Sequence, residues 1–234
     1  METISYSSEK LRLMLTTGYI GLLATLMVGT GEFMVHFSGG EVYKDVAFSF
    51  YHFVNESNFM PAQYLLVFGI PCYFVGYWHV FMALSPGNKR MAIITMMLGI
   101  FSFTVGGVWV GSRAFLGSIF HYFDGINDLD TFAIIATKYE MYIEVLVQIL
   151  RVLVLLVSGF FIFTILKYKT AYPKWMAAFN PILILLIVFA LYFGVPVIGV
   201  YLIPTAMNIA HFVMFSFSIL SIKSQIKNGK ISVL

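Results

Sequence analysis

Charged residues are scarce in this sequence, making up 11% of its 234 residues, whereas 60% are hydrophobic. An ordinary soluble domain contains roughly 25% charged residues. A soluble fold of this length has too little polar surface to cover so much apolar area, because part of every helix must face water. The composition therefore excludes an ordinary soluble domain and predicts a protein whose surface lies largely in lipid.

Cysteine is almost absent as well, since Cys72 is the only one in the chain. A single cysteine excludes an intramolecular disulfide framework and a multi-cysteine metal site. The sequence also lacks a basic arm, a glycine-rich phosphate loop and a nucleophile elbow, which are features of nucleic-acid binding, nucleotide binding and hydrolases. We therefore expect no nucleic-acid partner, no cofactor and no metal.

Long apolar stretches are what the sequence does contain. Six are long enough for the about 20 helical residues that cross a bilayer core, and we place them at about 13–37, 60–84, 91–119, 139–166, 175–195 and 199–222. The last two are separated at Gly194–Gly199, where Pro196 lacks a backbone donor and breaks the helix. The predicted fold is all-α, a polytopic membrane bundle of six transmembrane helices forming one domain over residues 1–234.

The basic residues predict the orientation of this bundle. Ten of the fourteen fall on one side if the chain crosses six times, namely Lys10, Arg12, Lys89, Arg90, Lys167, Lys169, Lys174, Lys223, Lys227 and Lys230, whereas only Lys44 and Lys138 fall on the other. Cytoplasmic loops carry an excess of Lys and Arg. Both termini are therefore expected in the cytoplasm, with the protein in the inner or plasma membrane of a cell.

Two loops on the outer side are long enough to matter. Residues 46–54 form an aromatic-rich run that is too short to span, so we expect it at the membrane interface or over the outer mouth of the bundle. Residues 120–138 are acidic and rich in turn-forming residues, and we expect them to form a solvated loop.

Polar residues inside the spans predict an interior pocket. A charged group at mid-bilayer costs about 2.5–3.5 kcal/mol, so such groups normally face the bundle interior. Helical spacing puts polar residues on one face of four spans: Gly18, Thr25, Glu32 and His36; Ser102, Gly106, Arg113 and Gly117; Glu140, Glu144, Gln148, Arg151 and Ser158; and Tyr201, Thr205, Asn208 and His211. At about 1.5 Å per residue, these groups predict a pocket that opens toward the outer face.

The charges of this pocket suggest chemistry. Two arginines face three carboxylates, so one carboxylate is left without a cation if each arginine forms one ion pair, and burial favours the neutral form of such a group. A carboxyl group of this kind is a candidate general acid or proton-coupling group. The candidate catalytic residues are Glu32 and Glu144, and the candidate substrate-binding residues are Arg113, Arg151, Asn208, His36 and Gln148.

Three classes of function remain open. The first is an acid–base enzyme acting on a lipid or isoprenoid-like substrate, and the second is a small-molecule or proton-coupled transporter with helices broken at Pro71, Pro181, Pro196 and Pro204. The third is a non-catalytic assembly or sensor protein whose Arg–Glu pairs only tie helices together. The expected partners are membrane lipid, an apolar or amphipathic small molecule and a second copy of the chain. Zinc at Glu32 and His36 with His121 or His211 is a further alternative, against the simpler interpretation of interhelical hydrogen bonds.

Overall fold

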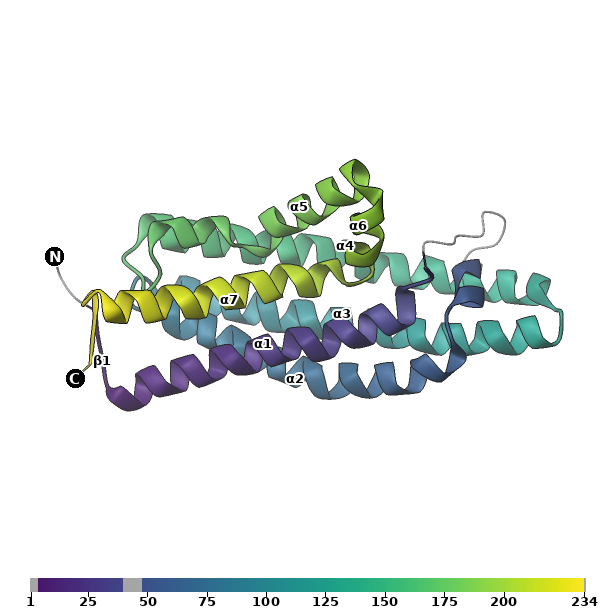
Figure 1. Cartoon of the computed structure of the whole chain (residues 1–234), viewed down its shortest axis with the longest axis horizontal. Helices are drawn as coiled ribbons and strands as arrows, with labels where there is room; N and C mark the ends of the chain where they lie inside the picture. The colour runs from purple at the N-terminus through teal and green to yellow at the C-terminus, as the bar shows by residue number, and fades with distance from the viewer. Residues whose placement is uncertain (1–3, 40–47, 234) are drawn as a thin grey trace.

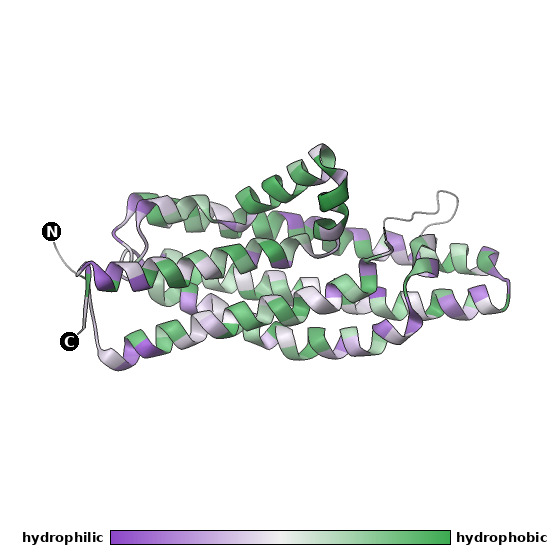
Figure 2. Cartoon of the chain, viewed as in Figure 1, coloured by the Kyte–Doolittle hydropathy of each residue, from purple (hydrophilic) through white to green (hydrophobic). Residues whose placement is uncertain are grey.

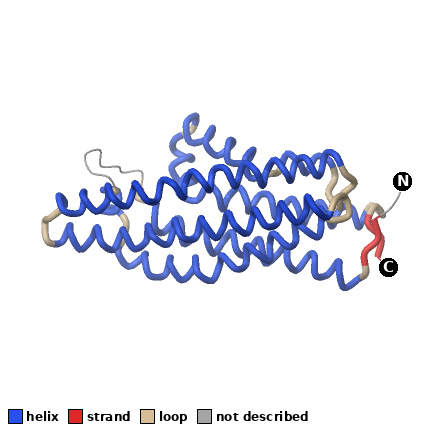
Figure 3. The backbone as a smooth tube through the Cα atoms, turned by 180° about the vertical axis from the view of Figure 1, so that it is seen from behind, coloured by secondary structure: helices blue, strands red, loops and turns tan. Residues whose placement is uncertain are grey.

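The computed structural model describes residues 4–39 and 48–233, which are almost entirely α-helical (Figures 1 and 3). Five helical segments are long and apolar enough to cross a membrane. They are α1 (Ser8–His36), α2 (Phe59–Leu84) with η2 (Glu56–Asn58) before it, α3 (Lys89–Gly125), α4 (Leu129–Lys167), and α7 (Ala206–Lys227) preceded by α6 (Pro196–Leu202) and η4 (Ile203–Thr205). The predicted all-α membrane bundle is confirmed.

The predicted fifth span is shorter than expected. Residues 175–195 form η3 (Lys174–Ala178) and α5 (Pro181–Gly194). Helix α5 extends about 21 Å, less than the about 30 Å of a hydrocarbon core, so the expectation of one continuous long helix over 175–195 is wrong. The chain turns back after α5 at Pro196, which begins α6, so the predicted break at this position is confirmed.

The two termini meet at one end of the bundle (Figure 1). Strand β1 (Ile4–Tyr6) pairs in parallel with β2 (Ile231–Val233), with Ile4 opposite Ile231. This pairing confirms that both ends of the chain lie on the same side. That this side is the cytoplasm stays a prediction from its Lys and Arg residues.

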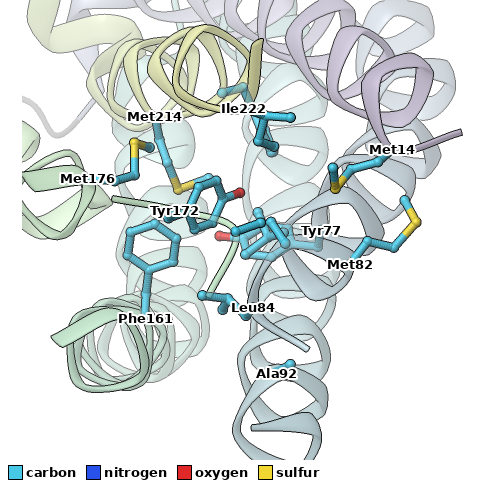
Figure 4. Close-up of a cluster of buried hydrophobic side chains, with 14 of the residues drawn as sticks. Met14, Tyr77, Met82, Leu84, Ala92, Phe161, Tyr172, Met176, Met214 and Ile222 are labelled. Carbon is cyan, nitrogen blue, oxygen red and sulfur yellow. The ribbon is translucent and has the colours of Figure 1, made fainter. Parts of the chain in front are cut away.

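The membrane-spanning part of the bundle packs around a large apolar core. Hydrophobic residues dominate the middle of the molecule in Figure 2, and Figure 4 shows part of the core, including Met14, Tyr77 and Phe161. Helices α1 and α2 approach closely at Gly21, where an added Cβ would lie 2.8 Å from the Cα of Gly76. This pair of glycines lets the two backbones touch.

Residues 120–138 are helical, which contradicts the expected solvated loop. Helix α3 continues to Gly125, and α4 begins after Asp128, whose side chain accepts a hydrogen bond from the Thr131 backbone N–H at 3.2 Å. The helices continue because Phe120 and Phe132 are buried in a second apolar cluster at the outer end. Only the short turn around Asp128 is left of the loop.

The aromatic-rich run folds over this outer end. Its described part contains η1 (Ser49–Phe53), whose Tyr51 is fully buried and donates its hydroxyl to the backbone carbonyl of Arg113 at 2.8 Å. Burial raises the pKa of the Tyr51 phenol, which keeps it a neutral donor. Val46 and Ala47, the first residues of this run, lie outside the described residues.

Candidate functional site

Three of the four predicted polar faces point into the bundle. On α1, Gly18, Thr25 and Glu32 are buried; on α3, Ser102 and Gly117 are buried; and on α7, Asn208 and His211 are buried. Tyr201 is the exception, because it lies in α6 and is 55% exposed. The shared interior predicted for α1, α3 and α7 is thus confirmed.

Glu32 and Asn208 form a buried link between three helices. The Asn208 side-chain amide donates to the Glu32 carboxylate, and the Tyr73 hydroxyl donates to the Asn208 amide oxygen at 2.7 Å. Glu32 is 6% exposed and Asn208 is 4% exposed. The link therefore ties α1 to α7 and α7 to α2, with both the nitrogen and the oxygen of the Asn208 side-chain amide hydrogen-bonded in the protein interior.

Further hydrogen bonds continue between α2 and α7 toward the end of the bundle that carries the termini. The Tyr77 hydroxyl lies 2.8 Å from His211 Nε2, and His79 Nε2 lies 2.5 Å from the Ser218 hydroxyl. Ser218 in turn lies 2.7 Å from the Tyr172 hydroxyl. The expectation that His79 and His211 make interhelical hydrogen bonds is confirmed.

Tyr73 and Tyr77 were missed as partners from sequence alone. Both lie in the apolar second span, where tyrosine is common and carries no signal by itself. Their separation by four residues puts them on one face of α2, and that spacing is the signal that could have found them.

The polar face of α4 does not point inward. Glu140, Glu144 and Gln148 are exposed, and the buried face of the helix is formed instead by Ile143, Val154 and Phe161. The prediction that all four stripes share the interior is therefore wrong for α4. Ser158 differs from the rest of the stripe, because it is buried and accepts a hydrogen bond from the Ile182 backbone N–H at 3.2 Å.

The polar residues of α4 form an ion pair and a hydrogen bond with one another. Arg151 Nη1 lies 3.8 Å from Glu144 Oε1, and Gln148 Nε2 donates to the same oxygen at 2.5 Å. The side chains of Arg151 and Glu144 are 65% and 54% exposed. The expected ion pair of one arginine with one carboxylate is present here, at the surface of the helix.

A cleft of about 520 Å³ lies where α1, α3, α4, α5 and η4 meet, and we call it the outer cleft. Its polar lining comprises Glu32, His36, Ser38, Trp109, Arg113 and Arg151. Apolar side chains of α5 and η4, including Leu185, Phe189 and Ile203, form much of the rest. The structure therefore brings together four of the seven predicted site residues in one opening, with Asn208 directly behind Glu32.

A second cavity of about 40 Å³ lies next to the outer cleft and deeper in the bundle, and we call it the inner cavity. The two share Glu32, Trp109, Leu150 and Met207 in their linings, so these four residues form the neck between them. Gly106 lines the inner cavity, and a Cβ added there would meet nothing within 4 Å. The neck thus joins a wide cleft to a small apolar space.

Polar atoms without partners gather at the outer cleft. Within residues 4–39 and 48–233, the buried atoms His36 Nε2, Trp109 Nε1 and Arg113 Nε have no hydrogen-bond partner. The Arg113 guanidinium lies over the Trp109 ring at 4.8 Å, and over Phe48 at 5.3 Å. The expected ion pair of Arg113 is not found among the described residues, where aromatic rings take its place.

The zinc alternative receives no support from the positions of the histidines. His211 is bonded to Tyr77, and His121 Nε2 lies 2.9 Å from the Val54 carbonyl oxygen. In the part of the chain that the structure describes, no three His, Cys, Asp or Glu side chains gather in a way that could hold a metal ion.

A family model described as a family of unknown function (DUF6796) matches residues 2–225. The chain belongs to the DUF6796 family. No curated protein and no solved structure matches it. Membership of DUF6796 covers nearly the whole helical bundle but names no activity, so an account of function depends on the geometry of the outer cleft.

Proposed function

We propose that this DUF6796 protein is an acid–base enzyme that acts on a lipid-like molecule from the outer leaflet, with Glu32 as its proton-transferring group. The observation that carries the proposal is the position of Glu32 at the neck between the outer cleft and the inner cavity. Among the described side chains, it is the only acidic one that is buried. A carboxyl group so placed can reach a bound molecule and exchange a proton with it.

The depth of the site favours a lipid-like substrate. At about 1.5 Å per residue, Glu32 lies about 30 Å along α1 from Arg12, and Arg113 lies about 35 Å along α3 from Arg90. These distances match the thickness of a hydrocarbon core, so the outer cleft falls at the boundary opposite the basic residues. An amphipathic molecule at that boundary would have its polar part at the cleft and its apolar part in the bundle.

The other predicted site residues take supporting roles in this proposal. Asn208 holds the Glu32 carboxyl group in position, and Arg113 is available for a polar head group. Glu144 is exposed and forms an ion pair with Arg151. Its role in this proposal is therefore to hold Arg151 at the cleft, and it does not transfer the proton. Gln148 supports Glu144 through its side-chain amide.

A proton-coupled carrier is a second candidate, favoured by one observation. Hydrogen-bonded polar pairs follow Glu32 along α2 and α7 toward the opposite end of the bundle, through Tyr77 with His211 and His79 with Ser218. Proton carriers use such intramembrane chains of titratable groups. The carrier would move protons and a solute without converting a lipid.

Reconstitution separates these candidates. Wild-type protein and Glu32→Gln would be incubated in liposomes of total polar lipid, and lipid products followed over time by mass spectrometry. Loss of a general acid or base slows turnover by about 10²–10⁴-fold, so we expect a product that forms with wild type and is nearly absent with Glu32→Gln. Glu9→Gln, at the exposed start of the same helix, is the control and should convert lipid at the wild-type rate.

Each other result has a defined meaning. Equal product formation by Glu32→Gln and wild type would contradict the enzyme. Absence of any product, combined with pH-driven solute uptake that Glu32→Gln abolishes, would favour the carrier. If the wild-type protein neither converts lipid nor takes up solute, the assembly or sensor class is the one that remains.

A further inference from the structure

We infer that the outer cleft binds an amphiphile with a phosphate monoester head group, held by Arg113 and Trp109, whose apolar chain lies against α5 and ends in the inner cavity. The inference names the ligand class of the site described under Proposed function, and it rests on that proposal only for the location of the site.

First, two hydrogen-bond donors that line the outer cleft are unused. Arg113 Nε and Trp109 Nε1 are buried, and neither has a hydrogen-bond partner in the described part of the chain. Both atoms can only donate, and buried donors in proteins are normally satisfied. Both residues line the outer cleft, so a ligand there with acceptor oxygens would satisfy both.

The second step is the charge of the ligand. Arg113 is packed against the Trp109 and Phe48 rings, and no described carboxylate lies within ion-pair distance of it. The acid that lines the cleft, Glu32, is engaged by Asn208 at the neck, and Arg151 is paired with Glu144. Among the described residues, Arg113 is therefore the cation of the cleft that has no ion-pair partner, and an oxyanion suits its planar array of donors.

Third, His36 distinguishes a phosphate monoester from a carboxylate. His36 Nδ1 lies 3.0 Å from the Glu32 backbone carbonyl oxygen, and a carbonyl oxygen can only accept, so Nδ1 carries the hydrogen. In the neutral ring Nε2 is then an acceptor, and it is buried in the cleft lining without a described partner. A singly protonated phosphate monoester has two unprotonated oxygens that share its negative charge and can accept from Arg113 and Trp109, and one P–OH that can donate to His36, whereas an ionised carboxylate has no hydroxyl proton.

The fourth step is the apolar chain. Leu185 and Phe189 of α5 and Ile203 of η4 line the cleft beside the polar groups. Past the neck, the inner cavity of about 40 Å³ has room for only the last few methylene groups of a chain. The expected ligand therefore has one chain that is mostly held in the outer cleft and reaches the inner cavity with its end.

Binding of dodecyl phosphate to the whole protein in lipid nanodiscs tests the head group. By native mass spectrometry we expect Arg113→Gln to weaken binding by about tenfold or more, because a charge-assisted contact is lost. Arg90→Gln is the matched control, because Arg90 is exposed at the opposite end of the same helix, and it should bind as wild type does. Equal affinity of Arg113→Gln and Arg90→Gln would overturn the inference.

Two further ligands test the class. Dodecanol lacks the charge and laurate lacks the hydroxyl proton, so both should bind at least several-fold more weakly than dodecyl phosphate. Dodecanol binding as tightly as dodecyl phosphate would overturn the anionic head group. Laurate binding as tightly would overturn the phosphate monoester.

A second pair of variants tests where the apolar chain of the ligand lies. Gly106→Leu fills the inner cavity and should weaken binding of dodecyl phosphate by about threefold, since only the chain end is displaced. Gly159→Leu is the control, because Gly159 is exposed on α4 and an added Cβ there also meets nothing within 4 Å. Equal affinity of the two variants would contradict a chain in the inner cavity.

The inference and the proposed function can fail separately. Dodecyl phosphate binding that depends on Arg113, without lipid conversion that depends on Glu32, would keep the ligand class and reject the enzyme. Lipid conversion that depends on Glu32, with no binding of dodecyl phosphate, would reject the ligand class and keep the enzyme.

Discussion

The polar residues of α7 and α4 have similar helical spacing and opposite environments. On α7, Asn208, His211 and Ser218 are buried and hydrogen-bonded to side chains of other helices. On α4, Glu144 and Gln148 are exposed and bonded within their own helix. The spacing of polar residues therefore shows that a helix has a polar face without showing where that face points.

Depth in the membrane explains the difference for Glu144. At about 1.5 Å per residue, His211 lies about 18 Å from Lys223, whereas Glu144 lies about 35 Å from Lys167. A polar group at the first depth is surrounded by hydrocarbon unless it faces protein. A polar group about 35 Å from the basic end reaches head groups and water, so α4 can turn its apolar face inward and leave Glu144 outside.

The largest expected effect comes from breaking the buried link. Asn208→Leu removes the partner of both the Glu32 carboxyl group and the Tyr73 hydroxyl. We expect the free energy of unfolding to fall by about 2 kcal/mol, since two buried polar groups lose their hydrogen bonds. Unfolding in mixed detergent micelles measures the change. Gln148→Leu on exposed α4 is the control, and an equal loss in both variants would remove the distinction between the two helices.

A smaller effect is expected nearer the end of the bundle that carries the termini. His79→Phe keeps the ring but loses the contacts of Nδ1 with the Met14 carbonyl oxygen at 2.6 Å and of Nε2 with Ser218. The Ser218 hydroxyl keeps Tyr172 as a partner, so we expect a loss of about 1 kcal/mol. The same unfolding measurement applies, with exposed His52→Phe as the control. Wild-type stability of His79→Phe would show that these buried bonds contribute nothing.

The smallest effect is expected on α4. Replacing both Glu144 and Arg151 by Gln removes an ion pair whose side chains are 54% and 65% exposed. Pairs of this kind contribute about 0–1 kcal/mol, so the unfolding free energy should change by less than about 0.5 kcal/mol. A loss as large as that of Asn208→Leu would mean that the α4 face is covered in the membrane by another protein surface.

The sequence predicted some parts of the site and missed others for identifiable reasons. Glu32 and Asn208 were found because a carboxylate and an amide in apolar spans stand out. Their partner Tyr73 was not found, since a tyrosine in an apolar helix carries no such signal. The acidic turn residues of 120–138 predict a loop, but Phe120 and Phe132 pack in a buried cluster that keeps the segment largely helical.

By itself, the sequence determined that the protein is an all-α membrane bundle, because apolar stretches of this length are stable only as helices in lipid. It also determined the break at Pro196 and the segregation of basic residues to one side. Only the tertiary structure decided that α5 is short, that α4 turns Glu144 outward and that Arg113 lies over aromatic rings. These features depend on which surfaces meet across helices far apart in the chain, and such contacts leave no local pattern in the sequence.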